Sequence, residues 1–160
     1  ALRIGYSEAT QFDSIDLEEK IQRIISEAKQ EFLEQQVVSL SEKMDKLKEE
    51  WSPVITINFT NKVVDLSPVQ QSVLFIVLQE CVTNSVRHGL ATIVDIDLED
   101  GSTDIPNRYR LRVTDNGVGP VGRRLPSGVG MRFLGELSDD SVELGFAPNG
   151  GALLEALIRC

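Results

Sequence analysis

Residues 73–89 read VLFIVLQECVTNSVRHG, and this stretch decides the fold. It opens with six consecutive apolar residues, from Val73 to Leu78. Ser67-Pro68 precedes it as a typical helix start, and Gly89 follows it as a typical helix end. The pattern therefore predicts a helix from about Ser67 to Gly89 that is apolar on nearly every side and largely buried.

A polar stripe interrupts this apolar helix at Glu80, Asn84 and His88, which are spaced four residues apart and share one face. Two interpretations of the stripe stay open: the solvent edge of an amphipathic helix, or the wall of a cleft. In a cleft, the amide oxygen of Asn84 would ligate a hard cation. Glu80 would there orient or deprotonate a hydroxyl group or a water molecule.

Strand patterns lie on both sides of the helix, and a second helix follows the glycine-rich part of the chain. The expected elements are strands at 54–59, 92–98 and 109–114, a loop at 117–130, a helix at 131–137, and strands at 142–146 and 152–158. Short turns join the later strands in pairs, so the order predicts an α/β (α+β) two-layer sandwich. Helices would cover one face of a mixed, mainly antiparallel sheet.

The N-terminal part of the chain has helical spacing in two segments. Apolar residues recur at Leu17, Ile21, Ile24, Ile25, Ala28, Phe32 and Leu33, and again at Leu40, Met44, Leu47 and Trp51. The segments are either amphipathic helices packed on a core or the start of a dimerising coiled coil. We expect residues 1–38 to form an N-terminal helical extension and residues 39–160 to form the main domain.

Asp115-Asn116-Gly117-Val118-Gly119 comes directly after a predicted strand. Asn-Gly favours a hairpin turn, but no strand follows within reach of such a turn. A carboxylate at a strand end can accept a hydrogen bond from the amino group of a flat heterocycle, and glycines let the backbone come close. The pattern GxGxxG at 117–122 is not a dinucleotide fingerprint, because Pro120 and Pro126 oppose the helix that it requires.

Gly128-Val129-Gly130-Met131 leads into the short helix. Glycines before a helix N-terminus leave backbone amides free for a phosphate group. Arg123 and Arg124 would either add positive charge to this site or remain solvated on the loop.

Composition excludes several classes of function. The 160-residue chain has a net charge of −9, which argues against nucleic acid as a partner. Cys81 and Cys160 are far apart and form no CxxC pair, so we expect free thiols and a reducing, cytoplasmic compartment. One histidine and two distant cysteines make no zinc site. Cys81 and His88 are roughly 10 Å apart along the helix, too far for a thiol–imidazole pair.

The three motifs, taken in order, resemble those of the GHKL ATPases. Residues 79–89 look like the N box, residues 115–119 like the first glycine box and residues 128–131 like the second. The resemblance covers about residues 39–160. The wording of the N box and the compact lid point to the nitrate-sensor and membrane-fluidity-sensor branch of sensor histidine kinases.

The resemblance implies a Bergerat fold that holds ATP and Mg²⁺ between the N-box helix and a lid. It implies that Asn84 coordinates magnesium, that Glu80 acts as base or water-positioner, and that His88 lies near the phosphates. Asp115 would bind the adenine amino group. The remaining residues implied to bind nucleotide are Gly117 and Gly119 at the adenine, Gly128 and Gly130 at the hinges of the lid, and Met131 at the start of the helix beyond.

The implied function is the catalytic ATP-binding domain of a two-component sensor histidine kinase, with a response regulator as partner. A homodimer is its assembly if the N-terminal segments form the coiled coil. Two departures matter. Gly151-Ala152 stands where the family has glycine and threonine. His88 is the only histidine and belongs to the N box, so the phosphoacceptor either lies in a domain upstream of Ala1 or has been lost. Two further functions stay open: a non-catalytic nucleotide-binding or dimerisation module, and an anti-sigma-factor serine kinase.

Overall fold

The computed structural model describes residues 19–30, 38–101, 108–120 and 128–159. Contacts divide the chain into two units, with the boundary between Val37 and Val38. In the first unit, residues 19–30 are helical, and Ile21, Ile24 and Ile25 are exposed. The residues named above that lie outside the described residues are Ala1, Leu17, Phe32, Leu33, Arg123, Arg124, Pro126 and Cys160.

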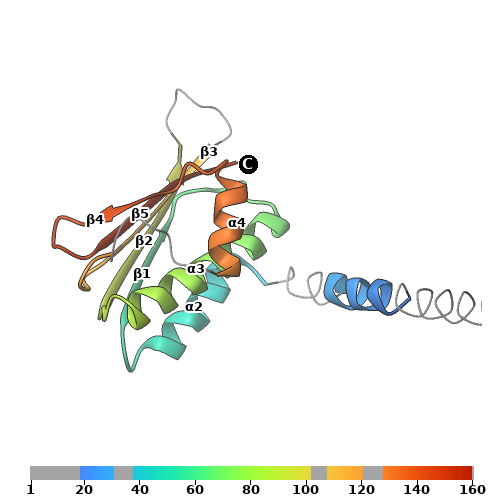
Figure 1. Ribbon diagram of the computed structural model, residues 1–160, viewed down its shortest axis with the longest axis horizontal. Helices are drawn as coiled ribbons and strands as arrows, with labels where there is room; N and C mark the ends of the chain where they lie inside the picture. The colour runs from blue at the N-terminus through green and yellow to red at the C-terminus, as the bar shows by residue number, and fades with distance from the viewer. Residues whose placement is uncertain (1–18, 31–37, 102–107, 121–127, 160) are drawn as a thin grey trace, which may run out of the picture. The chain divides into compact units, whose positions relative to one another are not determined.

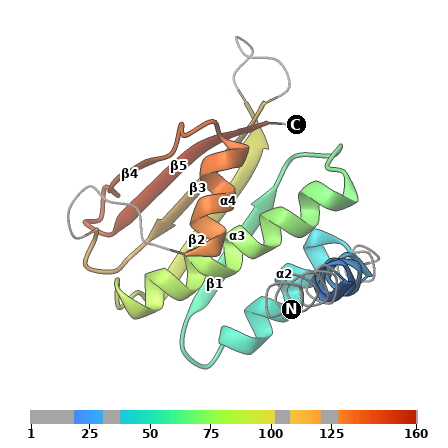
Figure 2. The same cartoon turned by 45° about the vertical axis from the view of Figure 1, so that its right-hand side comes forward.

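The second unit is a two-layer sandwich (Figure 1). Its elements are α2 (Leu40–Trp51), β1 (Thr56–Asn61), α3 (Pro68–Arg87), β2 (Ile93–Asp100), β3 (Arg108–Asp115), α4 (Val129–Leu137), β4 (Glu143–Phe146) and β5 (Ala152–Arg159). The sheet has the order β1-β2-β3-β5-β4, and only the β1–β2 pair is parallel. The three helices lie on one face of it (Figure 2). The prediction of a mixed, mainly antiparallel sheet under helices is confirmed.

The core lies between the helices and the covered face of the sheet. In β3, burial alternates along the strand, so Leu111 and Val113 point toward the helices while Arg110 and Arg112 point away. Asp115 continues this two-residue period. A carboxylate is thereby placed on the covered, apolar face, and this placement creates the site described below.

Local sequence explains why α3 begins and ends where it does. The Ser67 side chain accepts from the Gln70 backbone, the Gln70 side chain accepts from the Ser67 backbone, and Pro68 occupies the first turn. The helix ends at Arg87, and His88 is its C-cap. Within the described residues, none of the helices combines the length and the hydropathy needed to cross a bilayer.

The expected start of the last helix at Met131 is wrong by two residues, because α4 begins at Val129 and contains Gly130. The reason is a tertiary contact. The Gly130 amide donates to the Glu80 carboxylate of α3, which holds the first turn of α4 against that helix. A side chain at position 130 would collide with this carboxylate.

Candidate functional site

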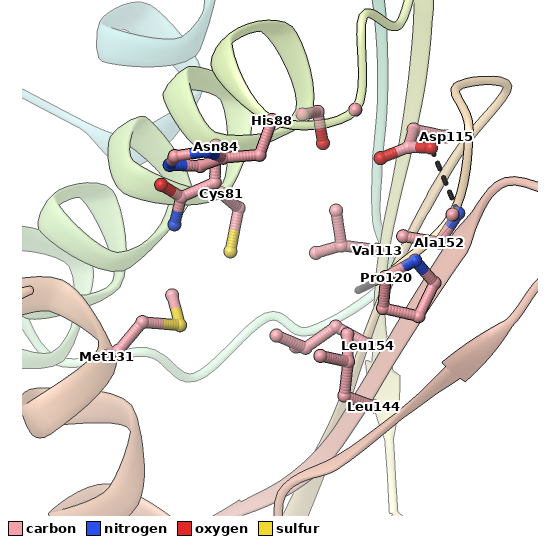
Figure 3. A pocket seen from close by; sticks show the side chains of 13 residues that line it. Cys81, Asn84, His88, Val113, Asp115, Pro120, Met131, Leu144, Ala152 and Leu154 are labelled. Atoms are coloured by element: carbon pink, nitrogen blue, oxygen red, sulfur yellow. Dashed lines mark hydrogen bonds between the residues drawn. The ribbon is translucent and has the colours of Figure 1, made fainter. Parts of the chain in front are cut away.

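A pocket of about 370 Å³ lies between α3 and the covered face of the sheet. Figure 3 shows Cys81, Asn84 and His88 on its helical side, with Met131 of α4 beside them. Asp115 and Ala152 lie opposite, on the strands. Five residues expected at a site line this pocket: Asn84, His88, Asp115, Gly119 and Met131. Four do not line it: Glu80, Gly117, Gly128 and Gly130.

Asp115 is the buried anion of the pocket, with 4% of its surface exposed. Its Oδ1 accepts from the Gly117 amide at 2.9 Å and from the Ala152 amide at 3.0 Å. These two bonds fix the carboxylate at the end of β3 and join it to β5. The other oxygen is directed into the pocket (Figure 3), where it is available to a ligand donor.

Glycines let three backbone segments come together around this carboxylate. A side chain on Gly117 would collide with the Gly89 carbonyl, and one on Gly151 would collide with the Asp115 carbonyl. The Val118 amide donates to the Gly89 carbonyl at 2.8 Å, which joins the end of α3 to the end of β3. Gly151 therefore lets β5 come close to the carboxylate, because it has no side chain.

Asn84 and His88 line the pocket from α3. The Asn84 Nδ2 atom is buried and has no hydrogen-bond partner among the residues that the structure describes. A buried amide of this kind is available to a ligand. The polar stripe on α3 is therefore partly the wall of a cleft.

The protein alone supplies few ligands for a cation at this stripe. No group of three His, Cys, Asp or Glu side chains within the described ranges is arranged to hold a metal ion. A magnesium ion suits such a position only when most of its ligands are phosphate oxygens and water. Asn84, which lines the pocket, could contribute only one oxygen ligand to such an ion.

Glu80 turns away from the pocket toward the first turn of α4. It accepts from Gly130, and a side chain on Gly128 or Gly130 would collide with its carboxylate. The Glu80 side chain therefore fits here only because both positions of the second motif are glycines. The Glu80 carboxylate thus accepts the hydrogen bond of a backbone amide at a helix N-terminus. Amides in this position are groups that bind phosphate.

The remaining walls are apolar. Cys81, Val113, Leu144 and Leu154 line the pocket, and Leu144 and Leu154 are cross-strand partners in β4 and β5. Burial, with a smaller contribution from the Glu80 charge, raises the pKa of Cys81 to about 12. The thiol is therefore protonated at neutral pH and acts as an apolar surface, in agreement with the exclusion of a nucleophilic role.

Sequence reasoning missed Ser85 and Gly89, which also line the pocket. Helical spacing could have indicated both, because Cys81, Ser85 and Gly89 are four residues apart and so share one face. Leu144 and Leu154 gave no local signal, since their place in the pocket depends on the pairing of β4 with β5.

No family model matches the chain. Among curated proteins, the methanol utilization control sensor protein MoxY of Paracoccus denitrificans is 47% identical over 51 residues. The matched stretch is 30% of this chain and only 11% of that relative.

Solved structures resemble the chain over a larger part of its length. The histidine kinase domain of a blue-light-activated kinase from Erythrobacter litoralis matches with a TM-score of 0.55 and 17% identity, covering 78% of this chain and 62% of that one. The ATP-binding domain of PrrB from Mycobacterium tuberculosis matches with a TM-score of 0.54 and 18% identity, covering 76% and 94%. Full-length ShkA in complex with AMPPNP matches with a TM-score of 0.52 and 20% identity, covering 77% and 31%.

These similarities establish the fold. The second unit has the α/β sandwich of histidine kinase catalytic domains, with the same kind of five-stranded mixed sheet.

Proposed function

We propose that residues 39–160 are the catalytic ATP-binding domain of a sensor histidine kinase, which binds Mg-ATP and donates its γ-phosphoryl group to a histidine outside this chain. One observation carries the proposal. Asn84 and His88 of α3 and Asp115 of β3 line one pocket with apolar walls, in a unit with the fold of histidine kinase ATP-binding domains.

The adenine would lie at the strand end of the pocket. The free oxygen of Asp115 accepts from the base amino group, while the other oxygen stays bonded to Gly117 and Ala152. Val113, Leu144 and Leu154 exclude water from the faces of the ring. Exclusion of water strengthens the hydrogen bond to the carboxylate, because the local dielectric constant is low.

The phosphates would lie at the helical end. Asn84 would hold magnesium through its amide oxygen, and the bound ion would neutralise charge on the phosphates. His88 is exposed at the same end of the pocket and would donate a hydrogen bond to a phosphate oxygen. The first turn of α4 supplies amides beside Gly128 and Gly130.

Glu80 would position or deprotonate the acceptor imidazole. In the structure its carboxylate is bonded to Gly130. If a phosphate oxygen accepted the hydrogen bond of the Gly130 amide instead, the Glu80 carboxylate would be free to contact the acceptor histidine. The first turn of α4 and Glu80 are thus expected to change partners together.

A kinase role for residues 39–160 also requires partners outside this domain. The acceptor histidine would belong to a domain that precedes these residues, and a response regulator would receive the phosphoryl group. The exposed Ile21, Ile24 and Ile25 of the first unit suit a homodimer. The N-box wording and the identity with a sensor protein favour the nitrate-sensor and membrane-fluidity-sensor branch.

A non-catalytic nucleotide-binding module is the second candidate. Ala152, which lines the pocket without a hydroxyl group, and the single histidine of the chain favour it. An anti-sigma-factor serine kinase would share the three motifs, but the helical segment before the domain suits a sensor kinase better.

Calorimetric titration with AMPPNP, with and without magnesium, tests the proposal. We expect wild-type protein to bind the nucleotide in a magnesium-dependent manner, and Asn84→Ala to lose most of that dependence. Asn58→Ala is the matched control, because Asn58 bonds to Asp95 at 2.7 Å on the exposed face of the sheet. Binding that ignores both magnesium and Asn84→Ala would contradict a kinase role.

A further inference from the structure

Ser85 is a buried polar residue of the pocket that the proposed function does not use. It follows Asn84 on α3, lines the pocket, and is only 8% exposed. Its hydroxyl makes no hydrogen bond within the described part of the chain. Thr83 on the same helix, in contrast, donates to the Gln79 carbonyl at 2.8 Å. The hydroxyl is not one of the enclosed side-chain atoms without a partner, so solvent reaches it, and a ligand in the pocket that Ser85 lines can take the place of that solvent.

Ser85 and Asp115 line the same pocket, Ser85 from α3 and Asp115 from β3. Gly89 lies between their backbones, because a side chain built on it would place its Cβ 2.6 Å from the Ser85 carbonyl oxygen and 3.5 Å from Asp115 Oδ2. A ligand in this pocket can therefore meet both residues. Both hydrogen bonds of Asp115 given above use Oδ1, so Oδ2 and the serine hydroxyl are the polar atoms left for a ligand at this end.

The Asp115 carboxylate oxygen and the Ser85 hydroxyl group together suit a ligand with a hydrogen-bond donor beside an acceptor. A carboxylate oxygen only accepts hydrogen bonds, whereas a hydroxyl group can donate one. Adenine offers an amino donor beside a ring nitrogen that accepts. Ala152 flanks the same carboxylate from β5, but its methyl group offers no hydrogen bond.

We propose that Ser85 is a base-recognition residue whose hydroxyl donates to the ring nitrogen beside the amino group bound by Asp115, directly or through one water molecule. The inference rests on the proposed function, because it requires a purine nucleotide in this pocket. It adds a second polar contact to the base, from the helix rather than from the sheet.

The test compares Ser85→Ala with Ser72→Ala by calorimetric titration with AMPPNP and magnesium. Ser72 is a matched control, since it is a buried serine of α3 that lies outside the pocket. We expect Ser85→Ala to weaken binding about 3- to 10-fold, the usual effect of one hydrogen bond. Ser72→Ala should keep wild-type affinity.

Two further measurements separate recognition from a structural role. Thermal unfolding without nucleotide should show that Ser85→Ala is at least as stable as wild type, because its hydroxyl is unpaired in the empty pocket. The double variant Ser85→Ala/Ala152→Thr should recover affinity, because threonine restores a hydroxyl group beside Asp115 from the opposite strand.

Four outcomes would overturn the inference. If Ser85→Ala binds like wild type while Asp115→Asn loses binding, Ser85 has no such role and the proposed function stands. If Ser85→Ala lowers the unfolding temperature and Ser72→Ala lowers affinity equally, the effect of position 85 is structural. If Ser85→Ala lowers nucleotide affinity and the added Ala152→Thr does not restore it, the lost affinity does not come from the missing hydroxyl group. If wild-type protein does not bind the nucleotide, the proposed function and this inference fail together.

Discussion

At the scale of single residues, the position of Asp115 follows from the period of a β-strand. Tyr109, Leu111 and Val113 are buried at every second position of β3, and Asp115 is the next in that series. A shift of this strand by one residue would turn the carboxylate to the opposite face of the sheet. The sequence alone predicts both the strand and the role of its terminal aspartate.

Asp115→Asn should change which base is bound without unfolding the protein. The Asn Oδ1 can still accept from Gly117 and Ala152, while an NH₂ group replaces Oδ2 in the pocket. That group repels the adenine amino donor but can donate to the carbonyl of hypoxanthine. We expect ATP affinity to fall at least about 10-fold and inosine triphosphate to bind better than ATP.

Competition titrations with the two nucleotides measure this preference, and the unfolding temperature serves as the control for folding. An Asp115→Asn variant that still prefers ATP would mean that the carboxylate does not contact the base.

Cys81 gives a prediction about pH. Its pKa is raised from 9.0 to about 12, so the folded protein keeps a proton that the unfolded chain loses above pH 9. The contribution of the neutral, buried thiol is therefore complete below pH 9 and is lost as the pH rises toward 12, by up to about 1.4 kcal/mol per pH unit.

Denaturant unfolding of wild type and Cys81→Ala at several pH values checks this sign. The stability advantage of wild type over Cys81→Ala should shrink between pH 9 and pH 11 and stay constant between pH 7 and pH 8. A constant difference across the whole range would show that the thiol is solvated.

Local pattern could not reveal the walls of the pocket. Leu144 and Leu154 face each other only because β4 pairs with β5 in one register. Phe146, an exposed aromatic at the end of β4, packs so closely on Gly119 that a Cβ on that glycine would lie 2.5 Å from the ring. Contacts of this kind depend on strand pairing, which the local sequence pattern does not predict.

At the scale of elements, α3 was predictable because its boundaries and its burial have local causes. Its capping box and proline mark the start, and its apolar run demands burial. The start of α4 was not predictable to the residue, because the Glu80 contact to Gly130 decides it. The motif at residues 79–89 and the motif at residues 128–131, which are far apart in the sequence, are thus in direct contact in the structure.

Glu80→Gln tests how the two helices work together. A glutamine carbonyl oxygen can still accept from Gly130, so the fold should be retained. The variant removes negative charge beside the expected phosphates, and we therefore expect nucleotide affinity equal to or above that of wild type. Phosphoryl transfer should fall at least about 100-fold, because the general base is gone.

Titration with AMPPNP measures the affinity, and transfer of labelled phosphate in the full-length protein measures the reaction. Gln79→Glu/Glu80→Gln is a useful control, since Gln79 is the exposed neighbour on α3 and the exchange keeps the net charge. Full transfer activity in Glu80→Gln would remove Glu80 from the reaction.

At the scale of the whole molecule, the core and the site belong to one unit. Every residue of the hydrophobic core cluster lies between Leu40 and Ile158, within the second unit. The ion pairs of Asp139 with Arg108 at 3.0 Å and with Arg159 at 3.1 Å tie the end of α4 to β3 and β5. The pocket and α4 are therefore held by the same sheet.

The class of fold was accessible from the order of helices and strands, because short turns force neighbouring strands to pair. The order β1-β2-β3-β5-β4 was not, since nothing local places β5 between β3 and β4. That insertion brings Ala152 beside Asp115 and closes the pocket.

Two-dimensional amide spectra of the protein, recorded during titration with AMPPNP and magnesium, test the central claim most directly. The largest shift changes should fall at Asn84–Gly89, Asp115–Gly119, Gly128–Met131 and Gly151–Ala152, which approach one pocket from four segments of the chain. Changes centred instead on Asn58, Asp95 and Arg112, on the exposed face of the sheet, or no changes at all, would contradict the proposed nucleotide site.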